Sequence, residues 1–88
     1  MGFEWDEDKR QANIRNHGID FVDIVSIFDH ALLTLEDTRF EYNEPRYWAF
    51  GMLGTEAILI VYTYQDQNAI RIISARKATK YEQKQFFS

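Results

Sequence analysis

Hydrophobic residues in the first third of the chain recur at the spacing of a buried helix face. Between residues 20 and 30 they follow the i, i+3, i+4, i+7 pattern of a helix with one side in the core. The residues of this stripe are Phe21, Ile24, Val25, Ile27 and Phe28. Asp20 precedes them as an N-cap. An earlier helix is predicted from its own N-cap, Asp6, to about Asn16, and Gly18 suits the left-handed position that ends it.

From residue 32 onward the apolar positions change to patterns typical of strands, including one almost continuously apolar run of the kind that is covered on both faces. The candidate strands are 3–5, 32–35, 47–53, 57–64 and 70–76. Thr79 and Glu82 have the spacing of a capping box, which predicts a short final helix to Ser88. The pattern predicts an α+β fold with two N-terminal helices, an antiparallel β-sheet of about four strands and a short C-terminal helix.

Length and composition indicate one domain spanning residues 1–88. The 88 residues are 45% hydrophobic and 16% aromatic, which is enough apolar material for a core. The absence of cysteine excludes disulfides, thiolate metal sites and a cysteine nucleophile. The start of the chain lacks a signal-peptide pattern, and the longest apolar run, residues 57–62, is too short to span a bilayer. We therefore expect a cytoplasmic protein with no membrane contact.

Charge and motifs exclude several classes of function. A net charge of −4 argues against a general nucleic-acid binder, and no predicted helix is basic enough to read a major groove. The sequence contains no phosphate-binding glycine loop, no nucleophile elbow and no metalloprotease motif. Its two histidines are too few and too far apart for a histidine metal site. No cofactor and no metal are expected.

A group of cations remains as candidate chemistry. Arginine matches phosphate oxygens with two parallel hydrogen bonds, and a histidine beside it can move a proton near neutral pH. Metal-free RNA cleavage requires a group that takes the 2′-OH proton, cations that stabilise the charged phosphate, and a group that protonates the leaving 5′-oxygen. The candidate cations are Lys9, His17, Arg39, Arg46, Arg71, Arg76, Lys77 and Lys80.

These residues also have ordinary structural interpretations. His17 suits the C-terminal end of a helix, where a cation favours the dipole, and Lys9 suits a surface ion pair. Strict strand alternation places Arg71 and Arg76 on opposite faces, so that both line one site only if a bulge or the strand end turns the backbone between them. A binding module without catalysis is a second hypothesis: its cations at 71–80 would hold an acidic partner segment, and its aromatic hairpin at 47–64 would be an interaction sheet.

The order of several short motifs resembles one known family. The string FEWDEDKRQANIRNHGIDF at 3–21 is similar to the opening of the BrnT toxins, in which W-D-x-x-K is followed by an Asn and a His-Gly. The E-x-R pattern at 44–46, V-Y-T at 61–63 and R-I-I-S-A-R-K-A-T-x-x-E at 71–82 follow in the family's order. The resemblance covers nearly the whole chain.

The resemblance implies the toxin of a bacterial type II toxin–antitoxin system, with a compact RelE-like fold. It implies a metal-independent ribonuclease that cleaves RNA and inhibits growth by blocking translation. The implied partner is a BrnA-type ribbon-helix-helix antitoxin, whose dimer neutralises the toxin in a hetero-oligomer and provides the link to DNA. The family's polar positions correspond here to Lys9, His17, Glu44, Arg46, Arg71 and Arg76.

Roles for these positions follow from the same resemblance. The arginines at 46, 71 and 76 are expected to clamp phosphate, Lys9 or His17 to transfer the proton, and Glu44 to be an alternative base or orienting group. Two departures reduce the basic character: Asn16 replaces a residue that is often basic in the family, and the last helix ends in 86–88, where relatives tend to carry arginine. An inactive homologue is therefore an alternative.

Overall fold

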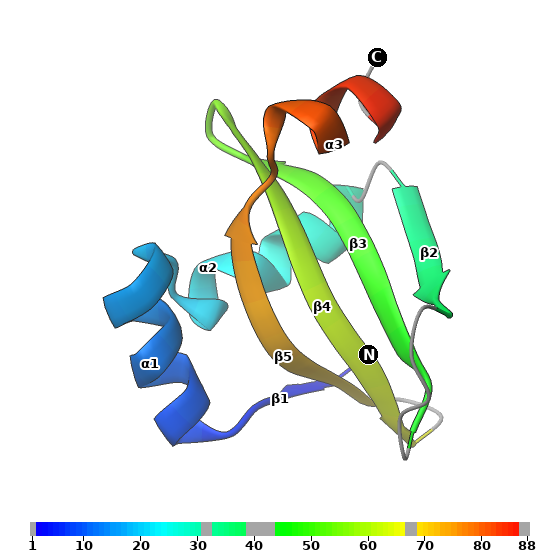
Figure 1. Ribbon diagram of the computed structural model, residues 1–88. Helices are drawn as coiled ribbons and strands as arrows, with labels where there is room; N and C mark the ends of the chain where they lie inside the picture. The colour runs from blue at the N-terminus through cyan, green and yellow to red at the C-terminus, as the bar shows by residue number, and fades with distance from the viewer. Residues whose placement is uncertain (1, 31–32, 39–43, 67–68, 87–88) are drawn as a thin grey trace.

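The computed structural model describes residues 2–30, 33–38, 44–66 and 69–86 of the chain (Figure 1). The elements in order are β1 (Gly2–Glu4), α1 (Glu7–His17), α2 (Phe21–Ile24), a 3-10 helix η1 (Val25–His30), β2 (Leu33–Asp37), β3 (Arg46–Leu53), β4 (Glu56–Asp66), β5 (Ala69–Lys77) and α3 (Lys80–Phe86). The predicted α+β class is confirmed, and so is the predicted order of helices and strands. Arg39, one of the candidate cations, lies outside the described residues.

The sheet differs from the predicted one. Its strand order is β1-β5-β4-β3-β2, and β1 runs parallel to β5 while the other pairs are antiparallel. The prediction of an antiparallel sheet of about four strands is therefore wrong, because the described residues form a mixed sheet of five. A strand of three residues has no periodicity of its own, and its pairing with Ala69–Arg71 depends on a partner far along the chain.

The second predicted helix is also irregular. The α-helix ends at Ile24, and residues 25–30 continue as a 3-10 helix, although Phe21, Ile24 and Ile27 are buried as the stripe predicts. An i, i+3 spacing fits either kind of helix, so the pattern did not distinguish them. The 3-10 turn brings Ile27 against β3 at Gly51, where an added Cβ atom would clash with the Ile27 Cγ2 atom.

Local capping signals define the first helix as predicted. The Asp6 side chain accepts a hydrogen bond from the backbone N–H of Lys9 at 3.1 Å. Gly18 adopts the left-handed conformation at φ 70° and donates its N–H to the Ile14 carbonyl at 2.8 Å. Arg10 then joins α1 to the start of α2, because its Nε donates to Asp20 at 2.8 Å.

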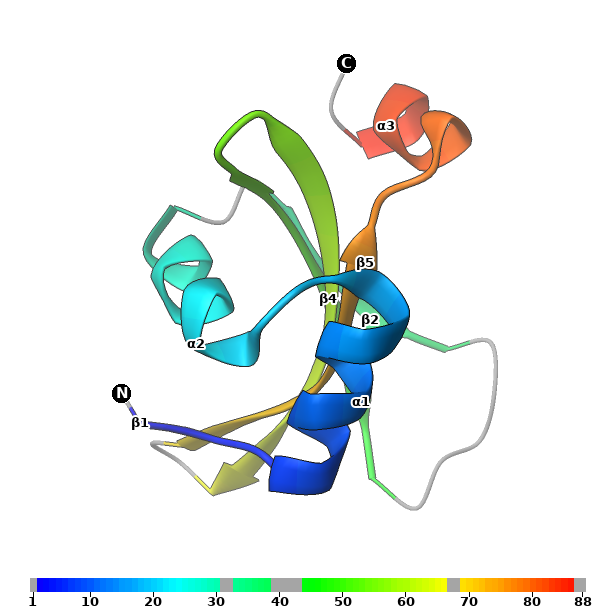
Figure 2. The ribbon, with the colours of Figure 1, turned by 90° about the vertical axis from the view of Figure 1, so that its left-hand side faces the viewer.

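The helices lie on both sides of the sheet (Figure 2). One face packs against α2 and η1 to form the core, while α1 lies along the β5 edge (Figures 1 and 2). The helix α3 covers one end of the opposite face, where the rings of Phe86 and Phe50 stack with centroids 4.6 Å apart. The rest of this second face, which we call the open face, carries the alternate residues of β3, β4 and β5, including Arg46, Arg71 and Arg76.

Candidate functional site

A bulge in β5 brings Arg71 and Arg76 to the same face of the sheet. Val61 pairs with Ser74, but the next residue of β4 pairs with Ile72, so β5 contains one additional residue there. Arg71 consequently faces Thr63 and Arg76 faces Leu59, two positions with the same orientation on β4. The bulge therefore cancels the strict alternation of side chains that would have placed the two arginines on opposite faces. They lie about 13 Å apart, the length of four strand residues.

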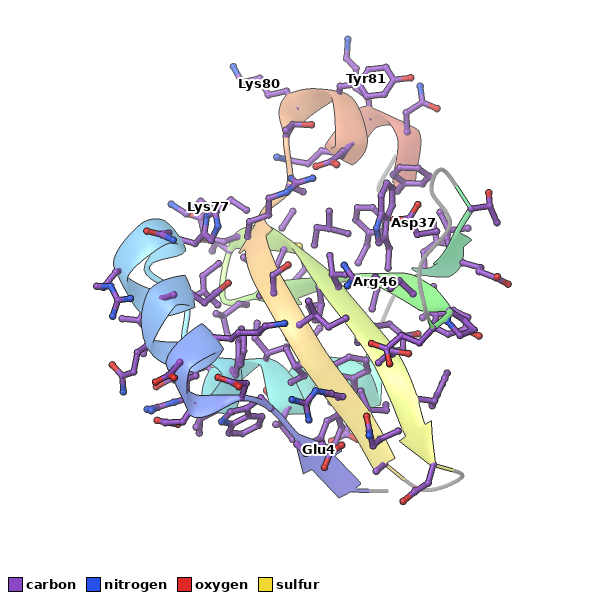
Figure 3. All side chains as sticks on the ribbon, turned by 60° about the horizontal axis from the view of Figure 1, so that its bottom comes forward. Glu4, Asp37, Arg46, Lys77, Lys80 and Tyr81 are labelled. Atoms are coloured by element: carbon purple, nitrogen blue, oxygen red, sulfur yellow. The ribbon has the colours of Figure 1, made fainter. Side chains whose placement is uncertain are left out.

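A polar row crosses the open face near the start of β5. Its members, one from each strand, are Asp37, Arg46, Thr63, Arg71 and Glu4. Direct cross-strand pairs join Asp37 to Arg46, Thr63 to Arg71, and Arg71 to Glu4. Arg46 precedes Tyr47, the partner of Tyr62, and so lies beside Thr63. Figure 3 shows how Asp37, Arg46 and Glu4 are distributed over the sheet.

Carboxylates stand beside the arginines of the row. Arg71 Nη1 is 3.7 Å from Glu4 Oε1, a buried oxygen atom that accepts no hydrogen bond within the described part of the chain. Asp37 is 8% exposed. Thr63 is buried as well, and its hydroxyl donates to the Pro45 carbonyl at 2.5 Å. The row therefore has two positive charges and two negative ones, with a buried hydroxyl between them.

A shallow, open pocket of about 500 Å³ lies at the other end of β5. It is lined by Asn16, His17, Arg76, Lys77 and Thr79, which come from the end of α1, the end of β5 and the segment before α3. Lys77 lies beside the C-terminal end of α1 in Figure 3. The structure thus brings together His17 and Arg76, two of the six predicted site residues, and adds Lys77, which the sequence had placed among the candidate cations.

The buried amide of Asn13 holds α1 against the edge of β5. Its Nδ2 donates to the carbonyls of Ala75 and Ile19, both at 2.9 Å, and its Oδ1 accepts from the Ala75 N–H at 3.1 Å. The side chain thus satisfies backbone groups that a neighbouring strand would otherwise pair with. Because His17 lies one turn after Asn13 and Arg76 follows Ala75, this contact sets the distance across the pocket. In the sequence, the only indication of this contact was a polar amide, Asn13, on the side of the helix that faces inward.

Glu82 on α3 holds the Arg76 side chain. Both Nη atoms of Arg76 donate to the carboxylate at 2.8 Å, and Nη1 also donates to the Lys77 carbonyl at 3.2 Å. The same carboxylate accepts the Thr79 N–H at 2.8 Å while Thr79 Oγ1 accepts the Glu82 N–H at 3.1 Å, which confirms the capping box. The hydrogen bonds from Arg76 lower the pKa of Glu82 to about 2. The sequence indicated the cap but not this contact with the site.

Lys9 and Glu44, the last two of the six predicted residues, lie away from both the pocket and the polar row. Lys9 is exposed on the first turn of α1, and eight residues at 1.5 Å each separate it from His17 by roughly 12 Å along the helix axis. Glu44 is exposed just before β3, two residues from Arg46. The six positions therefore form two groups, His17 with Arg76 and Arg46 with Arg71, and the two remaining residues join neither group by any contact we observe.

The described residues also bear on metals and membranes. In these segments no group of three or more His, Cys, Asp or Glu side chains is placed to hold a metal ion. None of the helices in the same segments combines the length and apolarity needed to cross a membrane.

Comparisons with known proteins point to one family. The family model "Ribonuclease toxin, BrnT, of type II toxin-antitoxin system" matches residues 5–82. The crystal structure of the Brucella abortus ribonuclease toxin, BrnT, is similar with a TM-score of 0.70 and 33% sequence identity, over 91% of this chain and 99% of that one. No curated protein sequence matches the chain.

Proposed function

The chain belongs to the BrnT family of ribonuclease toxins of type II toxin–antitoxin systems, and we propose that it cleaves RNA without a metal ion at the pocket between α1 and β5. One observation carries this proposal: an imidazole, that of His17, lines the same open pocket as Arg76 and Lys77. A module that only binds anions needs the cations alone, whereas a nuclease also needs a group that moves a proton beside the phosphate.

The reaction uses the nucleophile that RNA itself provides. His17 takes the proton of a 2′-OH while the 2′-oxygen attacks the adjacent phosphorus. Arg76 and Lys77 stabilise the additional negative charge of the five-coordinate phosphate. The bond to the 5′-oxygen breaks, and that oxygen takes a proton from Lys77 or from water. The products are a 2′,3′-cyclic phosphate and a 5′-hydroxyl end.

The arginines of the polar row have a different role in this proposal. Arg46 and Arg71 lie about 13 Å from the pocket along the open face and bind phosphates further along the same RNA strand. Lys9 and Glu44 lie outside both groups and have no assigned step.

The biological setting follows from the family. We propose that RNA cleavage in the cytoplasm blocks translation and stops growth, and that a BrnA-type ribbon-helix-helix antitoxin neutralises the toxin in a hetero-oligomer. Binding of the antitoxin over the pocket would silence the enzyme, and the antitoxin rather than this acidic chain would contact DNA. The net charge of −4 supports that division of roles.

The direct test compares purified wild-type protein with Arg76→Ala in an RNA cleavage assay that contains a chelator throughout. We expect wild-type activity and a loss of at least about 100-fold in the variant, because removal of one transition-state donor typically costs this much. Lys80→Ala, an exposed cation on α3, is the matched control and should leave activity unchanged. Equal cleavage by all three proteins would contradict the proposed site.

A binding module or inactive homologue is the second candidate. It is favoured by the ion pairs at the site, since Glu4 and Glu82 already stand beside Arg71 and Arg76. The aromatic hairpin gives it less support, because Phe50 and Tyr62 are buried in the fold rather than presented to a partner. Tight binding to the antitoxin with no RNA cleavage by the wild-type protein would favour this candidate.

A further inference from the structure

We propose that Glu82 is a positioning residue of the RNA-cleaving site, which holds the Arg76 guanidinium in the orientation that meets the reacting phosphate. The inference rests on the proposed function, and it adds a carboxylate from α3 to a site otherwise built from cations and an imidazole. It also gives a function to the C-terminal helix, from which none of the six predicted site residues comes.

The geometry of the contact is that of an orienting pair. Arg76 Nη1 and Nη2 each reach one carboxylate oxygen at 2.8 Å, the two-bond arrangement that fixes the plane of a guanidinium as well as its distance. The Glu82 side chain is 13% exposed and that of Arg76 is 37% exposed. The carboxylate is therefore the enclosed member of the pair, and the guanidinium is the member that reaches toward the pocket.

Glu82 is itself held from two directions. Its carboxylate accepts the Thr79 N–H, and its own N–H donates to Thr79 Oγ1, so the first turn of α3 fixes it. The preceding residue, Ala78, donates its N–H to the Ala57 carbonyl of β4 at 2.8 Å, which ties this turn to the sheet. A long arginine side chain would otherwise sample many rotamers, whereas here its end is attached to a turn anchored on the strand beside it.

Inhibition by Glu82 is the contrary effect, and it predicts a change of activity in the opposite direction. A carboxylate on the guanidinium fork could compete with the RNA phosphate, and its removal would then increase activity. The anchoring of Glu82 favours orientation over competition, because a competitor must leave the arginine while the capping hydrogen bonds keep this carboxylate in place. The direction of change in a variant therefore decides between the two effects.

The decisive variant is Glu82→Gln. Glutamine also serves at this position of a capping box, so the substitution removes the charge while it preserves the start of α3. We expect kcat for RNA cleavage to fall about 10- to 100-fold, with KM changed by less than about threefold, because the substitution affects transition-state contact rather than binding. Wild-type or higher activity in Glu82→Gln would overturn the proposal.

Two comparisons separate positioning from general damage. Glu56→Gln removes an exposed carboxylate that lies 3.6 Å from Lys77, too far for a hydrogen bond that would orient the ammonium group, and should change kcat by less than about threefold. In the Arg76→Ala background, Glu82→Gln should have no further effect on kcat, because its action passes through Arg76. Additive losses in the double variant would show that Glu82 acts elsewhere, and would also contradict the proposal.

A readout without RNA keeps this inference distinct from the proposed function. In ¹⁵N NMR spectra of the arginine side chains, the two-bond contact should slow rotation of the Arg76 guanidinium and give separate Nη signals in the wild-type protein. Glu82→Gln should average these signals, whereas Glu56→Gln should not. An inactive wild-type protein would remove the proposed function, while a freely rotating wild-type Arg76 would remove the positioning role whatever the activity.

Discussion

The two ends of the open face use the same charges in different surroundings. At the polar row, Arg71 lies 3.7 Å from Glu4 through one nitrogen, and no histidine is part of the row. At the pocket, Arg76 makes two hydrogen bonds of 2.8 Å to Glu82 and shares an open surface with His17. An arginine beside a carboxylate is thus common to both ends. The difference is the imidazole, and in our proposal a group that moves a proton is what separates a site for chemistry from a site for binding.

The largest difference in activity is expected between the variants in which one or the other of the two arginines is replaced by alanine. Arg76→Ala should reduce kcat/KM about 100- to 1000-fold, because it removes transition-state charge stabilisation. Arg71→Ala should reduce it only about tenfold and mainly through KM, since in the proposed mechanism that arginine binds the RNA strand away from the reacting phosphate. Steady-state kinetics on the same RNA measures both. Equal losses in kcat would show that the two ends belong to one catalytic site.

A smaller but still large effect is expected for His17→Gln. The variant should lose about 100-fold in kcat and should change the shape of the pH–rate profile, because it removes the group to which we assign proton transfer. His30→Gln, at the end of η1, is the matched control and should keep both the rate and the profile. A pH profile that is unchanged in His17→Gln would assign proton transfer to another group.

The contact that builds the pocket can be tested through stability. Asn13→Leu should lower the free energy of unfolding by about 3 kcal/mol, because it leaves the Ala75 N–H and two carbonyls buried without their partner. Gln11→Leu, exposed on the same helix, should change it by less than about 0.5 kcal/mol. Denaturant unfolding gives both values. A variant at Asn13 that is as stable as wild type would show that α1 docks by its apolar contacts alone.

The smallest effect concerns acid stability at the pocket end. The folded-state pKa of Glu82 is about 2, below its ordinary value of 4.5, so the ionised form is favoured by folding. Its contribution is complete above about pH 5 and is lost as the pH falls toward 2. We expect Glu82→Gln to remove no more than about 2 kcal/mol at pH 7, because the arginine partner is partly exposed. The stability difference from wild type should shrink between pH 5 and 2, and a constant difference would contradict this linkage.

Local signals predicted the parts of the fold that depend on neighbouring residues. The structure confirms the cap at Asp6, the left-handed Gly18 and the capping box at Thr79. These features could be predicted because each hydrogen bond spans only three or four residues. The six-residue site stays a prediction, and the structure shows only how its members are placed. The sequence proposed His17 and Arg76 as members of a phosphate site, and the structure puts them in one pocket. It did not indicate that Lys9 and Glu44 would lie apart from them.

Other features depended on partners far along the chain. The parallel pairing of β1 with β5, the bulge at Ile73 and the contact of Asn13 with Ala75 each join residues separated by a dozen to more than sixty positions, or depend on the register of such a pairing. Residue periodicity reports which side of an element is apolar, but it contains no information about register with a distant strand.

By itself, the sequence determined where the capped helix ends lie, which faces are apolar and which cationic residues are present, because these follow from residue type and short spacing. Only the tertiary structure decided which cations meet. One additional residue in β5 turned Arg71 and Arg76 to the same face, and one buried amide placed His17 beside the second of them. The bulge and the Asn13 contact both depend on hydrogen bonds to the backbone groups of a strand, and those bonds form only after distant segments have come together.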